Sequence, residues 1–158
     1  MAGQLTLALI KPHVHFARNV GKIITRIEEA GFGIILCKET QFTRHGASEF
    51  YQEHEGRPFF DNLVKVMSVS PIWAMVLAKP DAVAEWRGAI GATNPAEAEP
   101  GTIRHEFGDH QNLTNNAVHG SATDHDAKRE INFFFARDIQ LAEQVKAVTG
   151  RDLEYEMG

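Results

Sequence analysis

Apolar residues alternate with polar or small residues near the start of the chain, over residues 5–10. A period of two is typical of a strand, and the Lys11-Pro12 pair ends it. A second strand is predicted over 33–41. The apolar run 71–77 predicts a third strand, which should be central in its sheet because both of its faces are apolar. Ala117-Val118 is long enough only for a short edge strand.

Other segments carry apolar residues at helical spacing. Asn19 and Thr43 are candidate caps for two of these helices, and Gly31 is typical of a helix end. Pro80 is expected at the first position of another helix, where proline is favoured. Helices are therefore predicted over about 19–30, 43–51, 59–67, 80–90 and 124–135.

The order of these elements predicts an α/β sandwich in which helices pack on a small sheet. All 158 residues fit one domain, because single domains commonly contain roughly 100–200 residues. The segment from about residue 136 is a weakly helical C-terminal extension. Residues 91–116 form a long polar stretch rich in Gly, Pro and Asn. A loop of that size is usually functional, so the site is expected there.

Composition narrows the choice of function. A net charge of −5 argues against a protein that binds nucleic acid through a broad basic surface. The apolar N-terminal segment is too short for a signal peptide or a membrane span, which favours a cytoplasmic location and no membrane partner. Cys37 is the only cysteine, and its apolar neighbours predict a buried thiol.

Eight histidines raise the question of a metal site. On a strand, His13 and His15 would share one face, and His105 and His110 lie together in the polar stretch. No cysteine pairs and no HExxH motif accompany them, so no metal held by protein ligands is expected.

His119 stands in a setting of small residues, and Gly120 would leave its flank open to a ligand. Glu130 is a candidate partner for one ring nitrogen, which would leave the other nitrogen as a nucleophile. Lys11, Arg87 and Arg104 could converge as a phosphate clamp. Taken singly, such a histidine is more often structural and each such cation is more often a solvated surface charge.

Five short motifs follow one another along the chain, namely Leu9-Ile10-Lys11-Pro12, Arg57-Pro58-Phe59-Phe60, Gly91-Ala92-Thr93-Asn94-Pro95, Pro100-Gly101-Thr102-Ile103-Arg104 and Asn116-Ala117-Val118-His119-Gly120-Ser121. Together they resemble the nucleoside diphosphate kinase family over about residues 4–135. The resemblance implies a ferredoxin-like fold with a four-stranded antiparallel sheet, and reversible ping-pong transfer of the γ-phosphate from a nucleoside triphosphate such as ATP to a nucleoside diphosphate.

The resemblance also implies a set of site residues. His119 would be phosphorylated, Glu130 and Ser121 would orient it, and Tyr51 would lie beside it. Mg²⁺ would be the cofactor, held through the nucleotide phosphates, and the chain would form a homo-oligomer, a hexamer or a tetramer. Contacts to phosphate and ribose would come from Lys11, Arg87, Thr93, Arg104 and Asn116, and Phe59 would stack on the base without selecting it.

Three departures from the family pattern affect these assignments. His13 stands where the family usually has an acidic or amide residue, which should alter hydrogen bonding beside the clamp. The stretch between Arg104 and His119 holds two extra residues within 108–113, so the family pattern does not assign the apolar residue that covers the second face of the base. Leu63 and Leu113 are candidates for it. Ala122-Thr123 replaces Asp-Ser, which moves the next helix cap to Thr123 or Asp124.

The sequence disfavours two other functions. A non-catalytic, oligomeric nucleotide-binding member of the same family would be expected to lose His119, Lys11 or Arg104, and this chain keeps all three. A nucleic-acid-binding module on a ferredoxin-like sheet is disfavoured by the acidic charge balance and by the lack of an aromatic, basic ribonucleoprotein motif.

Overall fold

Four strands form one sheet in the structure, a computed structural model that describes residues 3–150. The order across the sheet is β2-β3-β1-β4, and every pairing is antiparallel. The predicted four-stranded ferredoxin-like sheet is therefore confirmed, with the third strand central and the short fourth strand at an edge. The strands are β1 (Leu5–Ile10), β2 (Gly33–Thr40), β3 (Ile72–Ala78) and β4 (Val118–Gly120).

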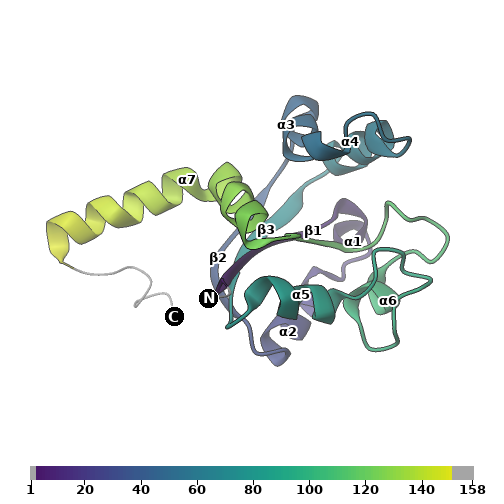
Figure 1. Cartoon of the computed structure of the whole chain (residues 1–158), viewed down its shortest axis with the longest axis horizontal. Coiled ribbons are helices and arrows are strands. Elements are labelled where there is room, and N and C mark those ends of the chain that lie inside the picture. Colours follow the sequence, from purple (N-terminus) through teal and green to yellow (C-terminus); the bar gives the residue numbers. More distant parts are fainter. Residues whose placement is uncertain (1–2, 151–158) are drawn as a thin grey trace.

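Helices cover both faces of this sheet (Figure 1). Helices α3, α4 and α7 pack on one face, and α1, α2, α5 and α6 pack on the other. A 3-10 turn, η1 (Gln52–His54), follows α3. The helices are α1 (Pro12–Phe16), α2 (Val20–Glu29), α3 (Arg44–Phe50), α4 (Phe60–Ser68), α5 (Ala82–Ile90), α6 (Ile103–Phe107) and α7 (Asp124–Thr149).

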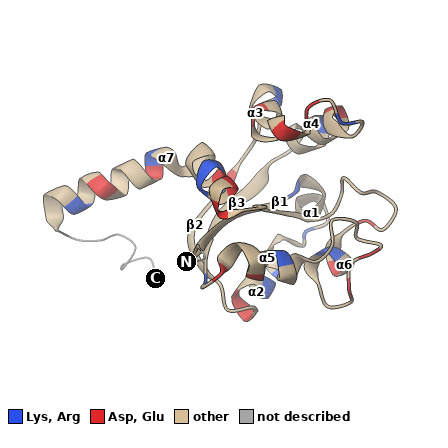
Figure 2. Cartoon of the chain, viewed as in Figure 1, with Lys and Arg blue, Asp and Glu red and all other residues tan. Residues whose placement is uncertain are grey.

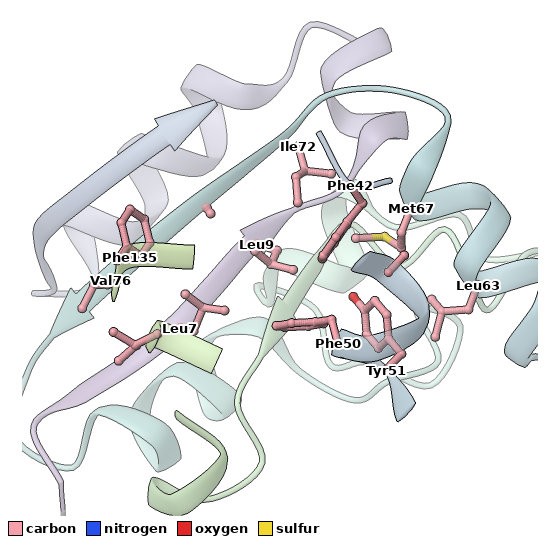
Figure 3. Packing of buried hydrophobic residues seen from close by; sticks show 13 residues of the cluster. Leu7, Leu9, Phe42, Phe50, Tyr51, Leu63, Met67, Ile72, Val76 and Phe135 are labelled. Atoms are coloured by element: carbon pink, nitrogen blue, oxygen red, sulfur yellow. The ribbon is translucent and has the colours of Figure 1, made fainter. Parts of the chain in front are cut away.

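Strand β1 contributes side chains to the hydrophobic cores on both sides of the sheet, because its side chains alternate between the two faces of the sheet. Leu7 and Leu9 belong to the core under α3, α4 and α7, where aromatic side chains such as Phe50 and Phe135 pack against them (Figure 3). Ala8 and Ile10 belong to the opposite core. Burial on both faces fixes the register of β1, which in turn fixes the position of β4 beside it.

Two of the predicted helix caps are confirmed by side-chain hydrogen bonds, whereas Asn19 precedes α2 but its side chain makes no capping bond. The side chain of Thr43 accepts a hydrogen bond from the backbone N–H of Gly46 at the start of α3. Thr123, rather than Asp124, caps α7 by accepting from the N–H of Asp126 at 3.0 Å. Both side chains satisfy backbone donors that the first turn of a helix leaves unpaired.

Several boundaries differ from the sequence predictions. Two five-residue helices, α1 and α6, were missed, since such short elements show little periodicity. Helix α5 begins at Ala82, so Pro80 precedes it, and the N-cap is Asp81 in a left-handed conformation with φ 57°. Helix α6 lies within the predicted loop 91–116. Helix α7 continues without interruption from the predicted segment to Thr149.

Cys37 was predicted to be buried, and this was wrong. Strand β2 is an edge strand with a bulge between Ile34 and Leu36, and none of its residues is fully buried. The Cys37 side chain is exposed as a result. His13 and His15 lie on helix α1 instead of on one face of a strand, so the spacing argument for a shared metal site does not apply to them.

The second half of α7 projects away from the sheet (Figure 1), and it carries charges of both signs (Figure 2). Leu141 and Val148 on this part are exposed. Among residues 3–150, no helix combines the length and the apolar character needed to cross a membrane.

Candidate active site

His119 is the middle residue of β4 and pairs with Leu9 of β1. Residues paired across two strands present their side chains on the same face, so the His119 ring faces the core formed by α3 and α7. Its ring centroid lies 5.3 Å from that of Phe50 and 6.0 Å from that of Tyr51. The side chain is 17% exposed. The short edge strand thus places the imidazole against the rings of Phe50 and Tyr51, while part of the imidazole stays accessible.

Glu130 of α7 holds this ring. Its Oε1 atom lies 2.7 Å from Nε2 of His119 and 2.9 Å from Oγ of Ser121, and its side chain is only 4% exposed. Ser121 donates to this carboxylate and accepts from the backbone N–H of Leu7 at 3.2 Å. Because an ionised carboxylate can only accept, Nε2 carries the proton and Nδ1 presents its lone pair. Nδ1 is therefore the ring nitrogen whose lone pair is available to a ligand.

A cavity of about 330 Å³ opens in front of this ring, within the size range of about 300–1,000 Å³ typical of small-molecule sites. The structure brings all ten predicted site residues together, because nine of them line the cavity and Ser121 lies behind Glu130. The nine are Lys11, Tyr51, Phe59, Arg87, Thr93, Arg104, Asn116, His119 and Glu130.

The three cations of the cavity are held close enough to repel one another. Burial, and then the charge of Arg104, lower the pKa of Lys11 from 10.5 to about 7. Burial, and then the charge of Arg87, lower the pKa of Arg104 to about 10. An anion bound between these side chains would relieve both repulsion and desolvation. The cavity is therefore built to receive negative charge.

Backbone carbonyls fix two of these cations. Lys11 Nζ donates to the carbonyl of Thr114 at 3.1 Å. Arg104 donates from Nη1 to Gly91 at 3.1 Å and from Nη2 to Val118 at 3.0 Å. Its Nε is buried and has no hydrogen-bond partner within the described part of the chain. An unpartnered buried donor of this kind is costly unless a ligand pairs with it.

Tyr51 and Asn116 present further polar atoms that lack partners. The Tyr51 hydroxyl is buried and unpaired among residues 3–150. Burial, and then the charge of Glu130, raise the pKa of this phenol, so it stays protonated and can donate. Asn116 donates from Nδ2 to the carbonyl of Thr93 at 3.0 Å, while its Oδ1 is unpaired in the same region.

Apolar side chains line the outer part of the cavity. Phe59 is 41% exposed, and Leu113, one of the two residues proposed for the second face of a base, is 51% exposed. Leu63, the other, also lines the cavity but is 7% exposed and belongs to the core. Leu113 is therefore the more accessible of the two side chains.

Sequence reasoning missed three residues at the cavity, His54, Glu53 and Thr114. The centroid of the His54 ring lies 5.4 Å from that of the Phe59 ring. Thr114 accepts from Asn62 of α4 at 3.2 Å through its hydroxyl oxygen. This bond connects α4 to the loop with the extra residues, a contact that no sequence pattern marks.

Gly120 lines the cavity beside His119, as expected, and it also allows a close packing contact. A Cβ there would meet Cδ1 of Trp86 at 2.7 Å. The Trp86 indole N–H donates to the carbonyl of His119 at 3.1 Å. A side chain at this position would clash with Trp86 of α5, which packs directly on the strand and holds the backbone of His119.

No group of three or more His, Cys, Asp or Glu side chains able to hold a metal ion occurs within residues 3–150. The His105 and His110 rings contact backbone carbonyls instead, those of Ala98 at 3.0 Å and of His105 at 2.7 Å. The cavity thus offers cations and neutral donors to a ligand.

Comparisons with known proteins agree with this geometry. Residues 4–139 match the family model described as nucleoside diphosphate kinase. The chain is 49% identical over 130 residues to the nucleoside diphosphate kinase of Trichlorobacter lovleyi, which covers 82% of this chain and 93% of that protein. It is 48% identical over 135 residues to that of Legionella pneumophila, covering 85% and 94% respectively.

Solved structures are similar as well. The nucleoside diphosphate kinase of Aquifex aeolicus superposes with a TM-score of 0.80 at 39% identity, covering 84% of this chain and 94% of that one. The enzyme of Halobacterium salinarum in complex with CDP gives a TM-score of 0.79 at 36% identity, covering 84% and 87%.

Proposed function

The chain belongs to the nucleoside diphosphate kinase family, and we propose that it transfers the phosphoryl group through a phosphohistidine on Nδ1 of His119. It is a phosphotransferase, as its relatives are named. The observation that carries the proposal is the 2.7 Å contact between His119 Nε2 and Glu130, at the wall of a cavity that also holds Lys11 and Arg104.

The first half-reaction forms one bond and breaks one. The Nδ1 lone pair of His119 attacks the γ-phosphorus of a nucleoside triphosphate, and the bond from that phosphorus to the β–γ bridging oxygen breaks. The nucleoside diphosphate leaves with the bonding electrons. The proton on Nε2 stays shared with Glu130, whose negative charge balances the positive charge that develops on the ring.

The second half-reaction reverses these steps with a different nucleotide. A terminal phosphate oxygen of a nucleoside diphosphate attacks the phosphorus, and the P–N bond breaks to regenerate neutral His119. In both directions the reacting phosphoryl oxygens carry negative charge in a loose transition state. Lys11, Arg87 and Arg104 stabilise that charge, and Tyr51 donates from its hydroxyl.

Nucleotide recognition divides between the inner and outer parts of the cavity. Asn116 and Thr93 contact ribose or phosphate, and Phe59 stacks on the base. Because every base has a π-face, stacking supports broad base tolerance. The CDP bound by the relative from Halobacterium salinarum fits the same use of the fold.

Mg²⁺ is the expected cofactor, bound through the nucleotide phosphates. The donor set fits this arrangement, since the cavity contributes cations and unpaired hydrogen-bonding groups but no cluster of metal-binding side chains within residues 3–150. When bound, the ion supplies charge neutralisation and orientation of the phosphates.

Nucleotide substrates are consistent with a cytoplasmic location. We also propose that the chain forms a homo-oligomer, either a hexamer or a tetramer. The apolar faces of α3 and α4 pack into the chain's own core. Support comes instead from large apolar side chains that remain exposed, namely Phe16 at 68% and Val69 at 59%. The single-domain assignment is supported by the two cores, which share one sheet.

The mechanism is tested by incubating the full chain with γ-labelled ATP and Mg²⁺. We expect an acid-labile, alkali-stable label that is released on adding CDP. His119→Ala should take up no label, while the matched variant of an exposed histidine, His125→Ala, should behave as wild type. An unlabelled wild type would indicate the non-catalytic alternative.

A further inference from the structure

The backbone directly before the nucleophile makes a tight turn centred on Ala117. Ala117 has φ 72°, in the left-handed region that residues with a Cβ rarely adopt. The N–H of Val118 donates to the carbonyl of Asn116 at 2.9 Å. A hydrogen bond between residues two apart around a central residue with this φ is typical of a γ-turn, a strained conformation. Such strain persists only where the surroundings hold it.

Two hydrogen bonds from the segment after β1 hold this turn on either side. The N–H of Lys11 donates to the carbonyl of Ala117 at 2.9 Å, and the N–H of Ala117 donates to Nε2 of His13 at 2.8 Å. Ala117 is completely buried, so water does not replace a lost partner easily. The His13 ring therefore satisfies a donor that would otherwise be left unpaired.

Only a neutral imidazole can serve here. Nε2 accepts, so the ring proton lies on Nδ1, and a protonated ring would have no lone pair to offer. Burial, followed by the charge of Lys11, lowers the pKa of His13 to about 4, while the charge of Asp109, in the loop after α6, opposes this. Burial is the largest of these effects, so the ring stays neutral and keeps its acceptor at neutral pH.

The turn joins two residues of the site. Asn116 precedes Ala117 and His119 follows one residue after Val118, so a change of the backbone at Ala117 moves both side chains. Displacement of a reacting group by about 1 Å can slow a reaction about 100-fold. His13 itself does not line the cavity. The hydrogen bond from the N–H of Ala117 connects its ring to the turn that carries both site residues.

We propose that His13 is a positioning residue for phosphoryl transfer, which holds the γ-turn at Ala117 by accepting its N–H and thereby aims Nδ1 of His119. This inference rests on the proposed role of His119. It assigns His13 a part in the reaction although the ring touches neither the nucleotide cavity nor the nucleophile.

The test measures the rate constant of His119 phosphorylation by MgATP in single turnovers. His13→Leu removes the acceptor and should slow the reaction about 10- to 100-fold. His13→Gln places an amide oxygen at a similar reach and should restore the rate to within a few-fold of wild type. His15→Leu is the matched control on the same helix, because the His15 ring contacts Phe16 and no residue of the turn, and its rate should be unchanged.

Rates are compared per folded molecule, by titrating the fraction of chains that can be labelled. A purely structural role would lower that fraction in His13→Leu but leave the rate constant of the remaining chains at the wild-type value, which would overturn the proposal. If His13→Leu does not fold, His13→Met is compared with His13→Gln. Equal rates for His13→Met and His13→Gln would also overturn the proposal. The two side chains have similar length, but only glutamine offers an oxygen acceptor.

The pH dependence adds a readout specific to the neutral acceptor. Glutamine does not titrate, so the ratio of wild-type to His13→Gln rate constants should stay constant between pH 5 and 8. A ratio that falls towards pH 5 would contradict a ring held neutral at that pH. Failure of the proposed function would look different from failure of this inference. If the proposed function is wrong, the wild type shows no phosphohistidine at any pH. A His13→Leu variant as fast as wild type refutes only the role of His13.

Discussion

Nucleotide binding should take up a proton at Lys11 when the pH lies above 7. Lys11 is 5% exposed, and burial together with the charge of Arg104 lowers its pKa from 10.5 to about 7 in the folded chain. Nucleotide phosphates bring negative charge next to Nζ and favour the protonated amine. At pH 8 about nine tenths of the free protein carries neutral Lys11, so binding should take up about 0.9 proton per chain.

The same shift sets how the stability of the nucleotide-free protein depends on pH. Between pH 7 and 10.5 the unfolded chain keeps the lysine proton and the folded chain has lost it. The free energy of unfolding therefore rises with pH across this window, by up to about 5 kcal/mol if the full difference in pKa is realised. Below pH 7 both states are protonated and this contribution is constant.

Calorimetric titration with MgADP at pH 8 measures the proton uptake, because the observed enthalpy varies with the ionisation enthalpy of the buffer. Lys11→Arg keeps its charge throughout and should reduce the uptake nearly to zero. Lys22→Met removes an exposed lysine outside the cavity and should leave the uptake unchanged. A wild-type uptake near zero would refute the assignment of a neutral Lys11 to the free protein.

Three substitutions test other parts of the site. Glu130→Gln removes the charge beside Nε2 and should slow phosphohistidine formation roughly 10- to 100-fold, as for loss of a charged hydrogen bond of about 1.5–3 kcal/mol; an unchanged single-turnover rate would argue against its role. Phe59→Ala should weaken ADP and CDP binding to a similar extent, by about 1–3 kcal/mol in calorimetry, and a strong purine bias would count against simple stacking. Gly120→Ala would force a Cβ to 2.7 Å from Trp86, and it should lower the free energy of unfolding in urea by about 1–3 kcal/mol. The control Gly21→Ala should not lower it, because a Cβ at Gly21 meets nothing within 4 Å.

Features encoded within a few residues could be predicted from the sequence. The alternation in β1 and the caps Thr43 and Thr123 depend on local spacing, and the structure confirms them. The site residues were identified because their motifs resemble a family, although they come from distant parts of the chain. The fold brings Lys11, Arg104 and His119 to one cavity, which supports that reading of the motifs.

Features set by tertiary contacts could not be predicted. Cys37 sits in an apolar run, yet its exposure follows from the edge position of β2. Gly120 suggested space for a ligand, but the contact that requires it comes from Trp86 on another element. His13 was visible only as a departure from the pattern, since its partner Ala117 lies 104 residues away along the chain.

The central claim is that Glu130 holds Nε2 of His119 so that Nδ1 receives the phosphoryl group. It is tested most directly by phosphorylating protein that contains ¹⁵N-labelled histidine and using phosphorus–nitrogen coupling to identify the bonded ring nitrogen. We predict one phosphoryl group per chain, on Nδ1 of His119 and lost on adding a nucleoside diphosphate. Attachment to Nε2, or to any other side chain, would contradict the account.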